Sequence, residues 1–310
     1  MSEAHMPKPG ALKLRLPATS ANLGPGFDAA AIALDFALEI AAVPAAEFAI
    51  AATGRNADQC GQLENNLILE TYKRLLGREQ KPIVPLSIQM QNEIPLGMGC
   101  GSSAAGLVAA ILLANHYGQL GWDENQMLDE AYALEGHPDN VAACLLGGFV
   151  TCACEGSRVY AAQVEPPEEW RALVVLPADP LSTKKARAVL PESYSRADVV
   201  ANIQSASLLG LAFATGDADL LRLAVRDRIH QPYRAAICPL LSPLLGMAGK
   251  KGILSASLSG AGPSVLVIVE NKELLEEAVA AVRAALCCDL ETEILTSRFP
   301  QTGAVATPIA

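Results

Sequence analysis

The chain has 310 residues, of which 51% are hydrophobic and 18% charged, with a formal net charge of −10. This composition excludes a disordered protein and is sufficient to bury the core of two domains. The acidic balance argues against nucleic-acid and membrane partners, so an anionic ligand would need a local binding device.

Compartment and membrane signals are weak. Residues 1–9 have no apolar run, which argues against a secretory signal, and the apolar run after Ser103 is too short to span a membrane. None of the eight cysteines forms a C-x-x-C pair. We therefore expect free thiols in a reducing cytoplasm.

The first hundred residues read as strands interrupted by polar segments. Residues 12–16 alternate apolar and charged and predict a strand, whereas residues 17–28 are typical of a turn. Ser20, Asn22 and Asp28 fall in that turn, where local side-chain to backbone bonds are the favoured explanation on this segment alone. Further strands are expected at 30–43, 48–52 and 86–92, and a helix over 65–76 with an asparagine cap.

A glycine-rich segment follows, with the sequence PLGMGCGSSAA over Pro95 to Ala105. Glycine at alternate positions favours a loop, and the apolar run behind it predicts a helix starting at Ser102 or Ser103. A loop that leads into a helix N-terminus is a natural phosphate site. The segment lacks the lysine of the P-loop and the G-x-x-G spacing of dinucleotide folds, which disfavours both.

A second polar cluster occupies residues 134–140, LEGHPDN, behind an amphipathic helix predicted over 123–133. Glycine and proline end that helix, and Asn140 is a candidate cap for a short helix over 141–146. Capping leaves Glu135, His137 and Asp139 unexplained. A strand is expected at 149–154.

Prolines and glutamates at 165–169 mark a boundary between an N-terminal ATP-binding domain, residues 1–165, and a C-terminal domain, residues 166–310. The second half alternates strands and helices, which favours an α+β arrangement. Its predicted strands are 172–176, 265–269 and 291–295; its predicted helices are 196–210, 218–229 and 273–286, with a short helix near 181–187 and a glycine/serine turn at 255–264.

Three glycine- and serine-rich loops, at 20–28, 95–105 and 257–264, resemble the three motifs of the GHMP family of small-molecule kinases. The first, SANLGPGFD, is similar to the form found in homoserine kinases, as are LEGHPDN at 134–140 and STKKAR at 182–187. The resemblance implies a two-domain α+β fold. Its N-terminal half is like ribosomal protein S5, with left-handed βαβ crossovers, and its C-terminal half is ferredoxin-like.

The resemblance implies ATP-dependent phosphorylation of the hydroxyl of L-homoserine, a step of threonine biosynthesis, with Mg²⁺ as cofactor. Asn66 matches an element near the adenine, although helix capping explains it equally well. Ser103, or its neighbour Ser102, and Glu135 are the implied metal ligands, since Mg²⁺ prefers oxygen donors. The ATP-binding loop comprises Pro95, Gly97, Gly99, Gly101, Ser102 and Ser103.

Homoserine carries a carboxylate, an ammonium group and a hydroxyl, and the resemblance supplies a partner for each. Arg187 and Arg234 would bind the carboxylate, and Asp28 the ammonium. The remaining implied substrate contacts are Asn22, His137, Asn140, Thr183 and Gly260.

The resemblance implies three catalytic residues: Asn140, Glu135 and Asn22. Mevalonate kinase relatives have an aspartate where this chain has Asn140, and a neutral amide cannot accept a proton. The hypothesis is therefore transfer without a protein base, the proton leaving to phosphate or water. Asp139 remains the alternative base.

Three other functions compete with this one. A kinase of the same family acting on another alcohol and a family member that only senses metabolites remain alternatives. Decarboxylation of a phosphorylated alcohol is excluded because the first motif is the wrong one. The family also implies a homodimer.

Overall fold

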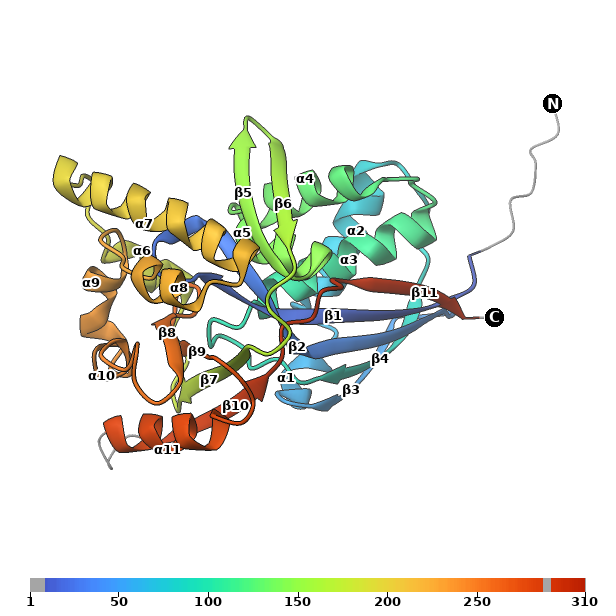
Figure 1. Ribbon diagram of the computed structural model, residues 1–310. Coiled ribbons are helices and arrows are strands. Elements are labelled where there is room, and N and C mark those ends of the chain that lie inside the picture. Colours follow the sequence, from blue (N-terminus) through green and yellow to red (C-terminus); the bar gives the residue numbers. More distant parts are fainter. Residues whose placement is uncertain (1–8, 287–290, 310) are drawn as a thin grey trace.

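The computed structural model describes residues 9–286 and 291–309, which build two β-sheets joined side by side (Figure 1). The first sheet has seven strands in the order β11-β1-β2-β4-β3, with β5 also on β2 and β6 on β5. The second has four strands in the order β10-β7-β9-β8. This is the two-domain α+β fold that the sequence predicts.

The first sheet is organised by a long hairpin of β1 (Ala11–Asn22) and β2 (Gly26–Pro44). β2 pairs with β4 (Leu86–Asn92) through one end and with β5 (Phe149–Glu155) through the other. The expectation of a turn from residue 17 was wrong, because β1 stays paired with β2 across a register shift between Pro17 and Ala18. Asp35 and Phe36 of β2 are the extra residues of this bulge, and β1 continues to Asn22.

Among the described strands, the only parallel pair is β3 (Ala49–Gly54) with β4. The chain between them passes through α1 (Ala57–Cys60) and α2 (Leu67–Arg78), so this is the βαβ crossover of the N-terminal half. The chain leaves β4 directly into the glycine loop, which places that loop at the end of the sheet.

Three helices continue the layer that α2 begins on this sheet: α3 (Ser102–Gly118), α4 (Glu124–Glu135) and α5 (Asp139–Leu146). α3 begins at Ser102, as predicted, and 12 of its 17 residues are buried because alanine and glycine allow close packing. The predicted cap of α5 was wrong: the N-cap position is Pro138, with no side-chain cap bond. Asn140 is thereby free for another role.

The second sheet consists of β7 (Arg171–Pro177), β8 (Ile253–Leu258), β9 (Val265–Val269) and β10 (Thr292–Ser297), all paired antiparallel. The helices between β7 and β8 and α11 (Leu275–Ala285) between β9 and β10 complete a ferredoxin-like βαββαβ unit. The predicted turn at 255–264 was wrong for 255–258, which belong to β8 because its serines are buried.

Both faces of this sheet are covered. Along β9, Val265, Val267 and Val269 enter a core shared with α10 (Leu241–Leu245) and α11. The alternate residues, Leu266 and Ile268, join the core of the first sheet. Successive side chains of a strand point to opposite faces of the sheet, so β9 contributes to both cores. This explains why its sequence is apolar at every position.

The connection from β7 to β8 contains α6 (Thr183–Ala188), α7 (Arg196–Thr215), α8 (Ala218–Ala224), α9 (Gln231–Arg234), a 3₁₀ turn (Ala235–Ile237) and α10. The prediction that α8 extends to Ile229 was wrong. The Asp227 carboxylate accepts hydrogen bonds from the N–H groups of Ile229, His230 and Gln231, which turns the chain.

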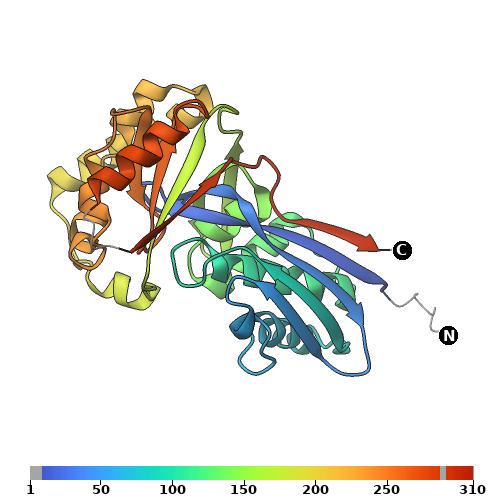
Figure 2. The same ribbon diagram turned by 90° about the horizontal axis from the view of Figure 1, so that it is seen from below.

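The last strand, β11 (Val305–Ile309), returns to the first sheet and pairs antiparallel with β1, so the described ends of the chain lie together (Figure 2). The division at residue 165 stays a prediction, and β11 shows that the chain after it also contributes to the first sheet. The sequence did not predict β6 (Arg158–Val164) or β11. The six described cysteines are free, and Cys287 and Cys288 lie outside the described residues.

Candidate active site

Six segments meet around one cavity of about 290 Å³. They are the turn between β1 and β2, the glycine loop, the loop between α4 and α5, the start of α6, the end of α9, and the turn between β8 and β9. Every predicted substrate contact lines the cavity, together with the glycines and serines of the loop and the predicted metal ligand: Asn22, Asp28, His137, Asn140, Thr183, Arg187, Arg234, Gly260, Gly97, Gly99, Gly101, Ser102, Ser103 and Glu135.

The glycine loop is shaped by left-handed residues. Gly97, Gly99 and Gly101 have φ of 70°, 77° and 70°, so any other residue would be strained there. A Cβ on Gly99 would also overlap the carbonyl of Ser259. α3 then starts without a side-chain cap, so its first N–H groups are available to an anion.

A second cavity of about 330 Å³ adjoins the first and shares Gly97, Ser102 and Ser103 with it. Its wall is largely apolar, with Ile68, Met90, Ile94 and other side chains, which suits a flat base attached to the phosphates at the loop.

Asn66 lines this second cavity, and its side chain is fully engaged. Its oxygen accepts bonds from the N–H groups of Ile68 and Leu69, and its amide nitrogen donates to Cys60 and Gln62 carbonyls. The capping interpretation is confirmed, and the adenine contact stays a prediction. Pro95 borders neither cavity; it lines a hollow with Arg55 and Leu176.

The predicted metal ligands meet at the edge of the loop. Ser103 Oγ donates a hydrogen bond of 2.8 Å to Glu135 Oε2. Among the described residues, no group of three His, Cys, Asp or Glu side chains could hold a metal ion. A hydroxyl and one carboxylate fit an ion that takes its other ligands from nucleotide phosphates and water.

Opposite the loop, Asp28 and Arg187 form a bidentate ion pair with N···O distances of 2.9 and 2.7 Å. The bond to Asp28 raises the pKa of Arg187. The groups assigned to the ammonium and the carboxylate of one substrate thus contact each other. A zwitterionic substrate that enters between them would replace this ion pair with two new ones, its ammonium on Asp28 and its carboxylate on Arg187.

Arg234 is only 1% exposed, yet no carboxylate of the described chain lies within salt-bridge distance of it. Its guanidinium donates to the carbonyls of Ala186 and Gly260 and to His230 Nδ1. Burial and the like charge of Arg187 lower its pKa. A buried cation without a counter-ion is costly, and an anion bound in the cavity would relieve that cost.

His230 and Phe27 hold the arginines in place. Burial lowers the pKa of His230, so it is neutral: Nε2–H donates to the Gly24 carbonyl at 2.8 Å, and Nδ1 is free to accept from Arg234. The Phe27 ring lies 5.5 and 5.4 Å from the Arg187 and Arg234 guanidinium carbons and stacks on His230.

The loop between α4 and α5 carries a linked acidic group. The Asp139 carboxylate, 2% exposed, contacts His137 Nδ1 at 3.1 Å and accepts from the Asn140 N–H at 2.8 Å. Burial lowers the pKa of His137, but the hydrogen bond to Asp139 and the charges of Asp139 and Glu135 outweigh it and raise the value above 6.5. The two carboxylates therefore favour the protonated form of His137.

Sequence reasoning missed Phe27, His230 and Thr19. Phe27 lies inside the first motif, and His230 lies four residues before Arg234, so both were adjacent to assigned residues. Thr19 lies 2.7 Å from Asn140 and one residue before that motif. No single-residue signal distinguishes it from other strand threonines.

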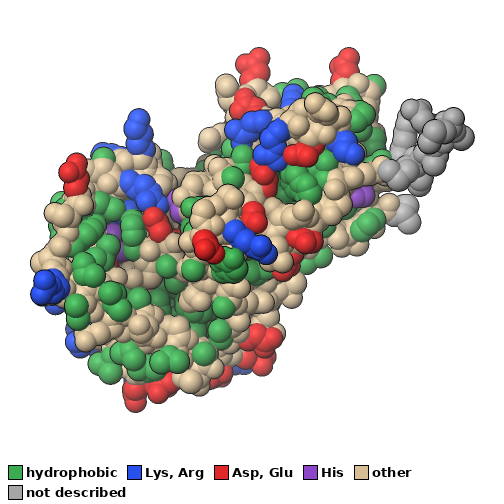
Figure 3. Space-filling view, turned by 90° about the horizontal axis from the view of Figure 1, so that it is seen from above, with side chains coloured by type: hydrophobic (Ala, Val, Ile, Leu, Met, Phe, Trp, Pro, Cys, Tyr) green, Lys and Arg blue, Asp and Glu red, His purple; other side chains and the backbone are tan. Residues whose placement is uncertain are grey.

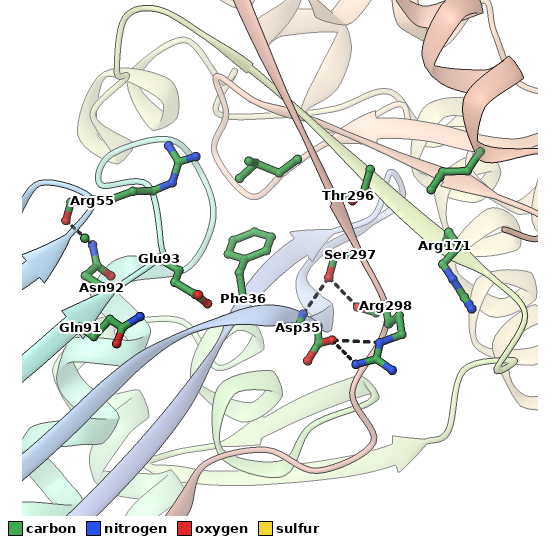
Figure 4. A pocket seen from close by; sticks show the side chains of 13 residues that line it. Asp35, Phe36, Arg55, Gln91, Asn92, Glu93, Arg171, Thr296, Ser297 and Arg298 are labelled. Atoms are coloured by element: carbon green, nitrogen blue, oxygen red, sulfur yellow. Dashed lines mark hydrogen bonds and ion pairs between the residues drawn. The ribbon is translucent and has the colours of Figure 1, made fainter.

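A larger hollow of about 840 Å³ lies where β2, β4 and β10 meet (Figure 4). Its charged groups already have partners: Arg298 bonds to Asp35, and Arg55 to Glu293. The start of α11, at Leu275, borders it, but none of the predicted site residues does. The smaller cavity, with its glycine loop and unpaired Arg234, is therefore the candidate active site.

Comparison with known proteins agrees with this geometry. The family model described as GHMP kinases N terminal domain matches residues 66–148, and the model for the C terminal domain matches residues 211–286. The chain is 45% identical to a homoserine kinase of Solibacter usitatus over 83% of this chain and 85% of that protein. A homoserine kinase of Deinococcus radiodurans is 39% identical over 84% of each chain.

Among solved structures, homoserine kinase from Cytophaga hutchinsonii superposes with a TM-score of 0.83 and 25% identity, over 99% of this chain and 100% of that one. A mevalonate diphosphate decarboxylase from Staphylococcus aureus, 13% identical with a TM-score of 0.69, shares the fold alone. The chain belongs to the GHMP kinase family, within its homoserine kinase branch.

Proposed function

We infer that the protein is a homoserine kinase, which converts ATP and L-homoserine into ADP and O-phospho-L-homoserine in threonine biosynthesis. Similarity to named homoserine kinases over most of the chain supports the activity. The observation that carries the substrate assignment is the buried Arg234, which has no carboxylate of the described residues within salt-bridge distance. It lies next to the Asp28–Arg187 pair and lines the same cavity as the glycine loop.

In this proposal the substrate lies between two sets of charges. Its carboxylate binds Arg187 and Arg234, its ammonium binds Asp28, and its hydroxyl reaches Asn140. The ATP phosphates bind the N–H groups of the glycine loop. This arrangement aligns hydroxyl and γ-phosphate, and alignment with charge stabilisation accounts for most of the catalysis of phosphoryl transfer.

The reaction forms one bond and breaks one. The hydroxyl oxygen attacks the γ-phosphorus, the bond from that phosphorus to the bridging oxygen breaks, and ADP leaves with the electron pair. Positive groups of the cavity, including the helix N-terminus, stabilise the charge that spreads over the γ-oxygens.

The proton needs a destination. Asn140 has no group that can take it. Asp139 Oδ1 is occupied by His137 and the Asn140 N–H, which supports a role in holding the loop. We propose that the hydroxyl proton leaves to the transferred phosphate or to water.

Mg²⁺ is the proposed cofactor, held by Ser103 and Glu135. Bound there, the ion would neutralise charge on the nucleotide phosphates. The 2.8 Å contact between the two side chains supports Ser103 rather than Ser102 as the hydroxyl ligand.

A homodimer is the proposed assembly, and α7 offers a surface for it. Val199, Val200, Ile203 and Leu211 on this helix are exposed, and its residues 199–215 carry no charge. By length and composition α7 could cross a membrane, but Asn202 bonds it to the Pro25 carbonyl and Phe213 stacks on Phe149. Figure 3 looks onto the side of the molecule where α7 lies, and hydrophobic side chains are frequent on that lobe.

Antiparallel pairing of two α7 helices would bring Arg196 at one end close to Asp217 and Asp219 at the other end of its partner. We also propose that the enzyme is cytoplasmic and has no nucleic-acid or membrane partner.

The activity is tested by ADP release from purified protein with homoserine, mevalonate, galactose and shikimate. We expect turnover with homoserine alone. Turnover of another alcohol but not of homoserine would be consistent with the GHMP family and would refute homoserine as the substrate. Homoserine binding without ADP release would indicate a sensor.

In the same assay, Arg234→Ala should raise the KM for homoserine about 10- to 100-fold, since it removes a charge-assisted contact, and leave that for ATP nearly unchanged. Arg298→Ala, in the larger hollow, is the matched control and should change neither. Equal increases of both KM values in Arg234→Ala would show that Arg234 does not bind the homoserine carboxylate.

Glu135→Gln should raise the Mg²⁺ concentration needed for half-maximal velocity by about tenfold or more, because an amide is a weaker ligand than a carboxylate. Glu124→Gln, on the exposed start of the same helix, should leave the Mg²⁺ dependence unchanged. An unchanged requirement in Glu135→Gln would exclude it as a ligand.

Asp139→Asn separates the two proton routes. General-base catalysis contributes about 10²- to 10⁴-fold, so a base at Asp139 would make the loss at least that large. Without such a base we expect kcat to fall by less than about tenfold, through the disturbed His137 contact. Abolished turnover with normal binding of both substrates would contradict the no-base mechanism.

Light scattering should give twice the chain mass of 32.4 kDa for the purified protein. Ile203→Glu, which introduces a charge into the apolar face of α7, should give the single mass. Ile83→Glu, at an exposed isoleucine outside α7, is the control. A wild-type monomer at micromolar concentration would refute the dimer.

A further inference from the structure

Thr19 lies at the junction between the nucleotide side and the acceptor side of the cavity. It belongs to β1 and is fully buried. Its backbone N–H donates to the Cys100 carbonyl in the glycine loop at 3.1 Å. Its hydroxyl donates to Asn140 Oδ1 at 2.7 Å. One residue thus contacts both the loop assigned to ATP and the amide assigned to the acceptor hydroxyl.

The direction of the second bond fixes the Asn140 amide. Because Oδ1 accepts from Thr19, the Nδ2 group is turned the other way. Nδ2 has no hydrogen-bond partner in the described chain and is not among its enclosed unpaired atoms, so it is accessible in the cavity that Asn140 lines. An amide Nδ2 only donates.

This orientation determines what Asn140 can do for a bound alcohol. Nδ2–H would donate to a lone pair of the hydroxyl oxygen, and the hydroxyl proton would then point away from Asn140. The second lone pair remains available to the phosphorus. With the amide flipped, Oδ1 would instead accept the hydroxyl proton and rotate the oxygen away from that arrangement.

The packing around Thr19 leaves it little freedom. A Cβ added to Gly101 would overlap Thr19 Oγ1, so the start of α3 lies directly against the hydroxyl. The bond to Cys100 fixes the backbone of Thr19 to the same loop. The distance from the phosphate loop to the Asn140 amide is therefore set through this one side chain.

We propose that Thr19 is a positioning residue for phosphoryl transfer: it holds the Asn140 amide with Nδ2 toward the acceptor hydroxyl and at a fixed distance from the glycine loop. The proposal rests on the proposed kinase activity. Thr19 itself contacts neither reacting group, so its effect passes through Asn140.

Thr19→Val keeps the shape of the side chain and removes the hydroxyl. Misplacement of a reacting group by about 1 Å costs up to about 100-fold in rate, so we expect kcat to fall about 10- to 100-fold, with both KM values within about threefold. Thr19→Ser, which retains the hydroxyl, should restore kcat to within about threefold of wild type. Thr71→Val is the matched control, at a buried threonine on α2 away from the cavity, and should leave kcat unchanged.

A double-mutant cycle tests the route. In an Asn140→Ala background, Thr19→Val should lower kcat by less than about twofold, because its target is gone. Full additivity of the two losses would overturn the proposal, as would wild-type kcat in Thr19→Val or no recovery in Thr19→Ser. Should Thr19→Val not fold, as judged by thermal unfolding, Thr19→Ala takes its place in the cycle.

Measurements on the wild-type protein distinguish a failure of this inference from a failure of the proposed kinase activity. Homoserine-dependent ADP release by wild type, with no kcat effect at Thr19, refutes the positioning role alone. A wild-type protein without that activity refutes both.

Discussion

The site depends on a single buried hydroxyl that joins all three glycine-rich motifs. Ser259 Oγ, at the end of β8, lies 2.8 Å from Ser20 Oγ and donates to the Gly99 carbonyl at 2.7 Å. The next N–H, of Gly260, donates to the Ala21 carbonyl at 3.0 Å. Because Ser259 and Ser20 are fully buried, their hydroxyls would be unsatisfied without these contacts. The turn from the second sheet is thus locked onto the strand and loop of the first.

Charge in the cavity is arranged for an incoming zwitterion. Asp28 and Arg187 satisfy each other, while Arg234 keeps only neutral partners. His230 contributes by staying neutral, since a cation there would repel Arg234 and could not accept its hydrogen bond. The site holds a net positive charge on its carboxylate side although the chain as a whole is acidic.

Secondary structure could be predicted where the sequence has a marked apolar pattern and failed where it has none. β9 is buried along its whole length and was predicted to the residue. β11 is exposed at every position and contains Pro308, so its sequence has no alternation; an edge strand tolerates both features. β8 contains buried serines, which resemble a turn in sequence but bond or pack inside the sheet.

The sequence by itself determined the glycine loop, the helix that starts at Ser102 and the residue types of the site, because left-handed turns and phosphate binding require particular residues over short spans. It also carried the family resemblance. Only the tertiary structure decided which groups are paired: that Asp28 contacts Arg187, that Arg234 has no carboxylate of the described residues within salt-bridge distance, and that Thr19 bonds to Asn140. These contacts join residues more than a hundred positions apart or depend on burial, and neither property can be derived from local sequence.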